Sequence, residues 1–230
     1  MSTQPIAALF DMDGVIVDNH RYHTDSWFQF VGRYGLSLTP EQYASYINGR
    51  VAADSLPYVF QRSLTPEELV TYTEEKEEIY REMYRANLQP TPGLISFLEE
   101  LKHNQVPMAV GTSAPVSNIS FTLDGIQVRS YFDTVVDASM ITRGKPDPEI
   151  YLTAAERLGI PPERCVVFED AFSGIEAGLR AGMRVVALAT THTREELTNT
   201  GASLIIADFR EINFKQLIER VIERGRAGVS

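Results

Sequence analysis

The sequence predicts an α/β fold, a doubly wound parallel sheet with a small helical domain inserted after its first strand. Two observations support this prediction. From about Pro90 onward, short apolar runs typical of buried strands alternate with segments whose apolar residues recur at helical spacing. Residues 18–88 instead show helical spacing throughout and are dense in aromatic and charged side chains. The 230 residues suffice for one full core and a small second domain.

The expected strands are apolar runs at residues 6–10, 108–111, 134–136, 166–168, 185–188 and 204–206. Helices are expected between them at residues 93–104, 115–125, 148–159, 172–181 and 193–200, with a last one near 212–224. Pro92 at a helix start and Gly159 after a helix end agree with these bounds. Because strands that are apolar throughout are buried on both faces, we expect a Rossmann-like sheet with helices on either side.

The inserted segment is predicted to be a helical bundle. Two stripes of apolar residues recur there at helical spacing: Trp27, Phe30, Val31 and Tyr34, and Tyr72, Ile79, Tyr80 and Met83. Linkers are expected near residues 17–19 and 89–93. We therefore predict an α/β core domain of residues 1–17 and 89–230 and a helical cap domain of residues 18–88, joined by a hinge on which the cap can open and close.

The composition excludes some classes of partner. The formal charge of −10 argues against non-specific binding to nucleic acid and against an anionic membrane surface, since both depend on Lys and Arg. It does not exclude a phosphate substrate, because a few local cations can reverse the field inside a cleft. No apolar stretch approaches the ~20 residues of a membrane span, and the N-terminal residues do not resemble a signal peptide. The single cysteine, Cys165, lies in an apolar run and is expected to be buried and inert. We expect a cytoplasmic monomer.

Two carboxylates, Asp11 and Asp13, follow the first strand and precede Gly14. Side chains two residues apart in an extended segment point to the same side. Two like charges that close together require a cation between them or a proton on one of them. The pair therefore indicates a divalent metal site, or a nucleophile beside an acid/base. Asp-Gly is also a common turn sequence, so a simple turn is the alternative for the pair taken alone.

In open parallel sheets, ligands bind beyond the carboxyl ends of the strands. The residues that follow the later strands are polar or charged: Thr112, Ser113, Lys145, Glu169 and Asp170. Each also has a structural explanation, because the two acidic residues could cap the following helix, and the lysine and the threonine could be ordinary loop residues. Taken together at matched strand ends, these residues favour a functional site.

The residue types indicate phosphoryl chemistry. The four carboxylates offer the oxygen ligands that Mg²⁺ prefers, and no Cys/His cluster in the sequence indicates zinc. Lys145 would neutralise phosphoryl oxygens, and Thr112 would donate a hydrogen bond to another. Asp11 could attack phosphorus and form an aspartyl-phosphate. Asp13 could then protonate the leaving oxygen and later activate water.

At these residues the chain resembles the haloacid dehalogenase-like (HAD) phosphotransferase superfamily. The matching segments are, in order, Asp11-Met12-Asp13-Gly14-Val15, Thr112, Lys145-Pro146, and Glu169-Asp170 with residues 173–178. The helical insertion after the first segment is similar to the cap of the β-phosphoglucomutase-like branch. The resemblance implies an aspartyl-phosphate at Asp11 and a small phosphorylated metabolite as substrate. It also implies a Mg²⁺ ion held by Asp11, the carbonyl group of Asp13, Glu169 and Asp170.

Substrate binding is expected from side chains of the cap and one of the core: His23, Asn48, Arg50, Lys76 and Ser113. Lys76 shares the packed stripe of its helix although glutamates flank it, and a lysine on a packed face needs a reason. The histidine also fits the alternative of an ordinary core residue with satisfied hydrogen bonds. Proteins similar to the mutases of this branch carry a histidine and a lysine at the corresponding cap positions.

The cap loop bears on the reaction. The mutases of this branch carry an arginine three residues after the glycine of this loop, and this chain has Ala52 there. We therefore expect a Mg²⁺-dependent phosphatase that acts on a sugar phosphate, another compact phosphate ester or pyrophosphate. The alternative is a β-phosphoglucomutase-type mutase, in which a sugar-phosphate hydroxyl replaces water. A non-catalytic binding or regulatory module is a more remote alternative.

Overall fold

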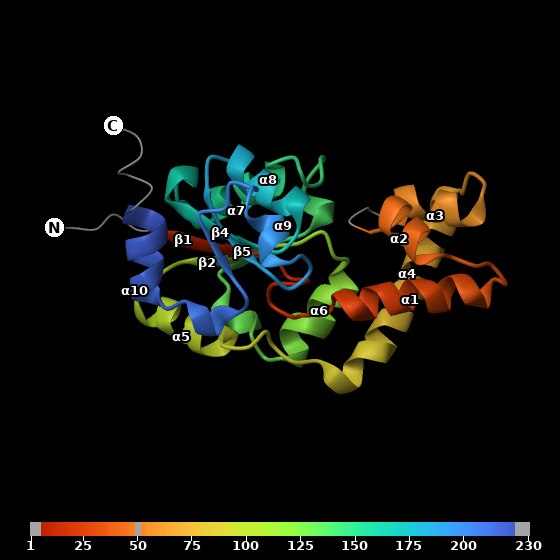
Figure 1. Cartoon of the computed structure of the whole chain (residues 1–230), viewed down its shortest axis with the longest axis horizontal. Coiled ribbons are helices and arrows are strands. Elements are labelled where there is room, and N and C mark those ends of the chain that lie inside the picture. Colours follow the sequence, from red (N-terminus) through yellow and green to blue (C-terminus); the bar gives the residue numbers. More distant parts are fainter. Residues whose placement is uncertain (1–5, 49–51, 224–230) are drawn as a thin grey trace. The chain divides into compact units, whose positions relative to one another are not determined.

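The computed structural model of the chain describes residues 6–48 and 52–223 (Figure 1). The chain divides into two compact units. The core unit contains the residues that precede Asn19 and those from Gln89 onward, and the cap unit is Asn19–Leu88. Each unit has its own hydrophobic core, so each is described by itself.

The core unit is built on a six-stranded sheet in which every pair of neighbouring strands is parallel, in the order β3-β2-β1-β4-β5-β6. Its strands are β1 (Ala7–Phe10), β2 (Met108–Gly111), β3 (Thr134–Val136), β4 (Cys165–Glu169), β5 (Arg184–Leu188) and β6 (Leu204–Ile206). The sequence predicted all of these to within a residue at either end, and the predicted α/β fold is confirmed. The apolar runs form strands because both faces of the sheet are covered, and β1, β2 and β4 are buried along their whole length.

Helices connect the strands and cover both faces of the sheet (Figure 1). They are α5 (Leu94–His103), α6 (Val116–Gly125), α7 (Glu149–Leu158), α8 (Phe172–Arg180), α9 (Arg194–Leu197) and α10 (Phe214–Leu217), which continues as a π-helix over Ile218–Glu223. Single 3-10 turns lie at Arg129–Tyr131, Ala138–Met140, Pro162–Arg164 and Phe209–Glu211. The helix expected at residues 193–200 is shorter, because the N–H groups of Thr198 and Thr200 bond to carbonyl groups three residues back instead of four.

The two faces of the sheet have different cores. Leu9 and Val167 lie in the cluster that α7 and α8 cover, with Ile150, Ala154 and Ile175. The next residues along the same strands, Phe10 and Phe168, stack at 4.7 Å on the other face, and they contact Phe97 and Phe209 there. This alternation along β1 and β4 follows from the two-residue period of a strand.

The cap unit is helical, with α1 (His20–Arg33), α2 (Pro40–Tyr46), α3 (Ala52–Phe60), α4 (Pro66–Tyr84) and a 3-10 turn at Arg85–Asn87. Helix α2 begins with a capping box of Thr39 and Gln42, and α4 begins with one of Thr65 and Glu68. The predicted stripes form the core of this unit: Trp27, Phe30, Val31 and Ile79 are buried. Tyr34 is an exception, because its side chain is 39% exposed and its hydroxyl reaches Glu75.

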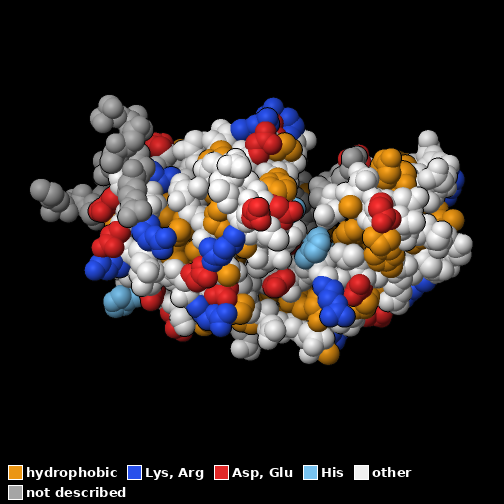
Figure 2. Space-filling view, viewed as in Figure 1, with side chains coloured by type: hydrophobic (Ala, Val, Ile, Leu, Met, Phe, Trp, Pro, Cys, Tyr) orange, Lys and Arg blue, Asp and Glu red, His pale blue; other side chains and the backbone are white. Residues whose placement is uncertain are grey.

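In residues 6–48 and 52–223, no helix is both long and apolar enough to cross a membrane. Acidic and basic side chains are intermixed over the face shown in Figure 2.

Candidate functional site

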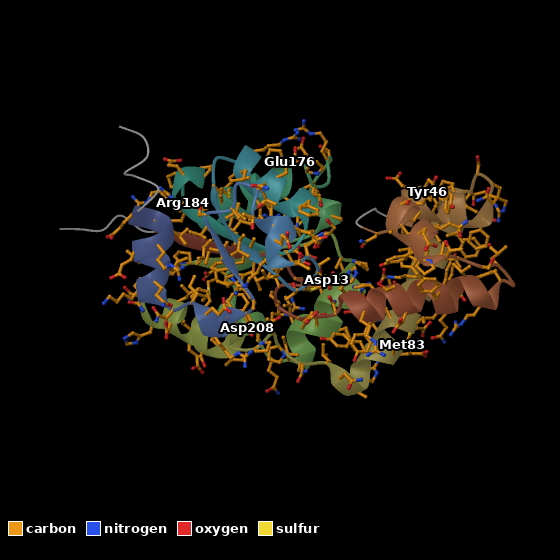
Figure 3. All side chains as sticks on the ribbon, in the orientation of Figure 1. Asp13, Tyr46, Met83, Glu176, Arg184 and Asp208 are labelled. Atoms are coloured by element: carbon orange, nitrogen blue, oxygen red, sulfur yellow. The ribbon has the colours of Figure 1, made fainter. Side chains whose placement is uncertain are left out.

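The register of the central strands brings the predicted site residues to one edge of the sheet. Phe10 of β1 lies opposite Val110 of β2 and Phe168 of β4. The residues that follow these positions, Asp11 and Glu169 among them, therefore emerge side by side. The strand order also reverses between β1 and β4, and it is at such a reversal that open parallel sheets bind their ligands. Figure 3 shows Asp13 at this edge and Arg184, the first residue of β5, at the opposite edge.

Three of the four predicted carboxylates form one buried cluster. Asp11, Glu169 and Asp170 each place a carboxylate oxygen within 4.8 Å of the other two. Asp13 follows in the turn and is half-buried. Glu169 and Asp170 do not cap the following helix. The N-cap residue of α8 is Ala171, and no side chain caps this helix.

Two glycines make room for the acidic cluster. Gly14 has a φ of 78°, and a Cβ atom there would lie 2.0 Å from Oδ2 of Asp170. A Cβ atom on Gly174, in the first turn of α8, would lie 1.7 Å from Oε1 of Glu169. Both distances are too short for any side chain, so the carboxylates occupy space that only glycine leaves open.

Lys145 links the carboxylates. Its Nζ atom donates to Oδ1 of Asp11 at 2.6 Å, to Oε1 of Glu169 at 2.7 Å and to the carbonyl oxygen of Gly111 at 3.2 Å. An ammonium group has three donors, and these contacts use all of them. Burial alone would lower the pKa of Lys145, but the attraction of the two carboxylates outweighs burial and raises it. The lysine is therefore charged at every physiological pH.

The carboxylates carry more charge than this lysine balances. The pKa of Asp11 is raised to about 7, first by burial and then by the negative charges of Glu169 and Asp13, although the charge of Lys145 opposes the shift. Burial and the charges of Glu169 and Asp11 also raise the pKa of Asp170 well above its usual range. A buried excess of negative charge on hard oxygen ligands is what a divalent cation such as Mg²⁺ would relieve.

The two predicted hydroxyl residues differ in their placement. Thr112 is buried, its N–H donates to the carbonyl oxygen of Val136 at 3.0 Å, and its Oγ1 accepts the N–H of Ala114 at 3.1 Å. The turn after β2 thus fixes the hydroxyl of Thr112 at the sheet edge. Ser113 is exposed.

Sequence reasoning missed three residues of this site. The hydroxyl of Thr191 donates to Oδ2 of Asp170, and Oγ1 of Thr190 donates to the carbonyl oxygen of Gly14 at 2.5 Å. Both threonines follow β5, so the strand-end argument, applied to that strand too, would have found them. Tyr151 donates its hydroxyl to Oε1 of Glu169 at 2.7 Å. It lies on the buried face of α7, where the sequence gives no signal to separate it from a core aromatic residue.

Within the cap unit, the two residues singled out by sequence lie together. Nζ of Lys76 is 3.1 Å from Nδ1 of His23 and donates to Oε1 of Glu77 at 3.0 Å. The histidine ring stacks on Tyr80 with 3.9 Å between the ring centroids. Lys76 is 3% exposed, as expected from its place on the packed stripe. Asn48 is exposed, and Arg50 lies outside the described residues.

Comparisons with known proteins agree with this geometry. A family model described as haloacid dehalogenase-like hydrolase matches residues 8–188. Fructose-1-phosphate phosphatase YqaB of Escherichia coli is 36% identical over 77% of this chain and 93% of its own length. A phosphorylated carbohydrates phosphatase of Thermotoga maritima is 33% identical over 77% of this chain and 82% of its own length. The crystal structure of β-phosphoglucomutase from Clostridium difficile superposes with a TM-score of 0.82, at 26% identity over 97% of this chain and all of that one.

Proposed function

We propose that this chain, which belongs to the haloacid dehalogenase-like hydrolase family and to its β-phosphoglucomutase-like branch, is a phosphatase for a small phosphorylated metabolite. The observation that supports it most directly is the contact of Lys145 with Asp11 beside the acidic cluster. Together they offer a nucleophile, a fixed cation and hard oxygen ligands at one sheet edge. Relatives at 36% and 33% identity are phosphatases of fructose 1-phosphate and of phosphorylated carbohydrates, which favours a sugar phosphate as substrate.

The acidic cluster fits a Mg²⁺ ion. Asp11 and Asp170 would hold it, with the backbone carbonyl of Asp13, and Glu169 completes the cluster. When bound, the ion would neutralise phosphoryl oxygens and lower the pKa of Asp11, so that this carboxylate is ionised when it attacks.

In the proposed reaction, a carboxylate oxygen of Asp11 bonds to phosphorus as the bond from phosphorus to the ester oxygen breaks. Asp13 gives its proton to that leaving oxygen, and the alcohol departs. Asp13 then takes a proton from a water molecule that attacks phosphorus and releases Asp11 and inorganic phosphate. Lys145 and Thr112 would hold the phosphoryl oxygens in both steps, by charge and by a donated hydrogen bond.

The cap would select the substrate. We propose that His23 and Lys76, with Asn48 and Arg50 of the cap loop and Ser113 of the core, bind the part of the substrate that leaves as the alcohol. A hinge between the units would let substrate enter and then exclude bulk water.

A mutase of the β-phosphoglucomutase type is the second candidate, supported by the similarity to the Clostridium difficile enzyme. Both reactions begin with transfer to Asp11 and differ in what attacks next. Two features favour the phosphatase: the cap loop has Ala52 where the resemblance predicts an arginine in mutases, and the more similar relatives are phosphatases.

A screen of phosphorylated metabolites with Mg²⁺, including pyrophosphate and β-glucose 1-phosphate with its bisphosphate activator, tests the proposal. Release of inorganic phosphate is expected, and glucose 6-phosphate formation without it would identify a mutase. Asp11→Asn should abolish turnover and leave the melting temperature near that of the wild type. Turnover in that variant would refute the aspartyl-phosphate, and no turnover of any ester by the wild type would favour a binding module.

A further inference from the structure

We infer that Tyr151 is a positioning residue of this site: its hydroxyl holds Glu169 in the place from which Glu169 orients Lys145. The inference rests on the proposed function, because it concerns how the lysine is held for phosphoryl transfer. It adds a role for a helix residue outside the strand-end motifs.

Tyr151 contacts Lys145 and two of the residues that bind this lysine. It is fully buried on α7, and its hydroxyl donates to Oε1 of Glu169 at 2.7 Å. The face of its ring lies 5.0 Å from Nζ of Lys145, within the range of a cation–π interaction. The ring also packs on Gly111, where an added Cβ would lie 3.2 Å from it. Tyr151 therefore touches Glu169, Lys145 and the strand whose carbonyl group binds that lysine.

The hydrogen bonds of Glu169 explain why the tyrosine hydroxyl matters. Oε1 accepts from Lys145 and Tyr151, and Oε2 accepts the N–H groups of Asp170 and Ala171 at 3.0 and 3.2 Å. A carboxylate has about four acceptor sites, so these four donors fill it. In this arrangement Glu169 acts on Lys145, and direct metal binding would need it to release one of the four donors.

Without the hydroxyl, one acceptor site of a buried carboxylate loses its donor. The Glu169 side chain is then held by fewer hydrogen bonds and can shift, so Lys145 loses a fixed partner.

Tyr151→Phe tests the inference, because it removes the hydroxyl and keeps the ring. Because a hydrogen bond to a charged group contributes a free energy that corresponds to about a tenfold change in rate, kcat should fall about tenfold. KM should stay within about twofold, since the lysine acts on charge that develops in the transition state. Binding of Mg²⁺ without substrate, measured by calorimetry, should be unchanged. Tyr43→Phe is the matched control, since it removes another buried hydroxyl, 3.1 Å from Thr24, and should leave kcat unchanged.

A double-mutant cycle separates positioning from simple packing. If Tyr151 acts through Glu169, then Tyr151→Phe should change kcat less than about twofold in a Glu169→Gln background. The inference would be overturned if the effects of Tyr151→Phe and Glu169→Gln on kcat multiply. It would also be overturned if Tyr151→Phe lowers kcat no more than Tyr43→Phe does. If Glu169→Gln is too slow to assay, binding of orthovanadate with Mg²⁺ replaces kcat in the same cycle. An inactive wild type would refute the proposed function and this role with it, whereas an active wild type with an unchanged Tyr151→Phe variant would refute this role alone.

Discussion

Replacing Gly174 by alanine separates the fold of α8 from the geometry of the site. Gly174 lies in the first turn of this helix with ordinary helical backbone, and alanine is favoured over glycine in helices by about 1 kcal/mol. A Cβ atom there, however, would lie 1.7 Å from Oε1 and 2.4 Å from Oε2 of Glu169. The substitution therefore favours the helix and displaces the carboxylate.

The size of the displacement sets the expected loss. Oε1 must move by about 1.7 Å to reach an ordinary contact distance of 3.4 Å. Its hydrogen bonds with Lys145 and Tyr151 are both 2.7 Å long and would not survive such a shift. A misplacement of about 1 Å in an active site can cost about 100-fold in rate, or about 2.7 kcal/mol in the transition state. Overpacking costs about 1–3 kcal/mol, so after the helix gain the net destabilisation should be at most about 2 kcal/mol.

The assay compares kcat/KM and the melting temperature of Gly174→Ala with those of Gly32→Ala. Gly32 lies near the end of α1, and nothing lies within 4 Å of a Cβ atom there, so its replacement should leave activity unchanged and stability equal or higher. Gly174→Ala should lose about 100-fold in kcat/KM and melt no more than about 8 °C lower. Wild-type activity in a folded Gly174→Ala variant would show that the position of Glu169 does not matter to the reaction.

Three further predictions concern the metal, the cap and the thiol. Excess EDTA should abolish turnover and added Mg²⁺ should restore it; activity that persists in chelator would contradict the metal assignment. Replacing both members of the buried ion pair, Lys76→Met with Glu77→Gln, should raise KM at nearly unchanged stability. Lys76→Met alone should destabilise the protein by up to about 3–5 kcal/mol, because the buried Glu77 carboxylate loses its contact with Lys76. An unchanged KM in the double variant would remove Lys76 from substrate recognition. Burial raises the pKa of Cys165 to about 12, so at pH 8 about one molecule in 10⁴ carries the thiolate and a disulfide reagent should react at once only after unfolding. Because burial favours the neutral thiol, the stability that the buried Cys165 thiol contributes is lost as the pH rises from about 8.5 toward the folded pKa of about 12. Rapid labelling of the native protein would contradict the prediction.

The strands could be predicted because each contains a short, continuous run of apolar residues. Residues such as Val166, Val167 and Phe168 leave no polar face, and in a chain of this size that pattern is satisfied only inside a sheet with helices on both sides. The strand ends then locate the site, since parallel strands deliver their next residues to one edge. This is why Lys145 and Asp11, 134 residues apart, could be expected to meet.

What the sequence did not reveal depends on contacts rather than on residue type. Tyr151 has the same place in the pattern of α7 as any core aromatic residue, and only its contact with Glu169 distinguishes it. Glu77 is one of four glutamates that flank Lys76 and would suit a solvated helix face, yet it is 9% exposed and paired with Lys76. In both cases a polar atom is buried beside a charged partner, which is Glu169 of β4 for Tyr151 and the neighbouring Lys76 for Glu77. Periodicity carries no information on such pairs.

The core unit and the cap unit have different parts in the proposed reaction. Both candidate reactions begin with transfer to Asp11, so the arrangement of carboxylates, lysine and threonine at the sheet edge suits either of them. The choice of acceptor therefore depends on the cap. Within the cap, the charge of Lys76 is matched by a buried carboxylate 3.0 Å away, so this pair adds no net charge with which to hold a second phosphate. A paired lysine beside His23 can still donate hydrogen bonds, which suits a substrate with a single phosphate and hydroxyl groups at its other end.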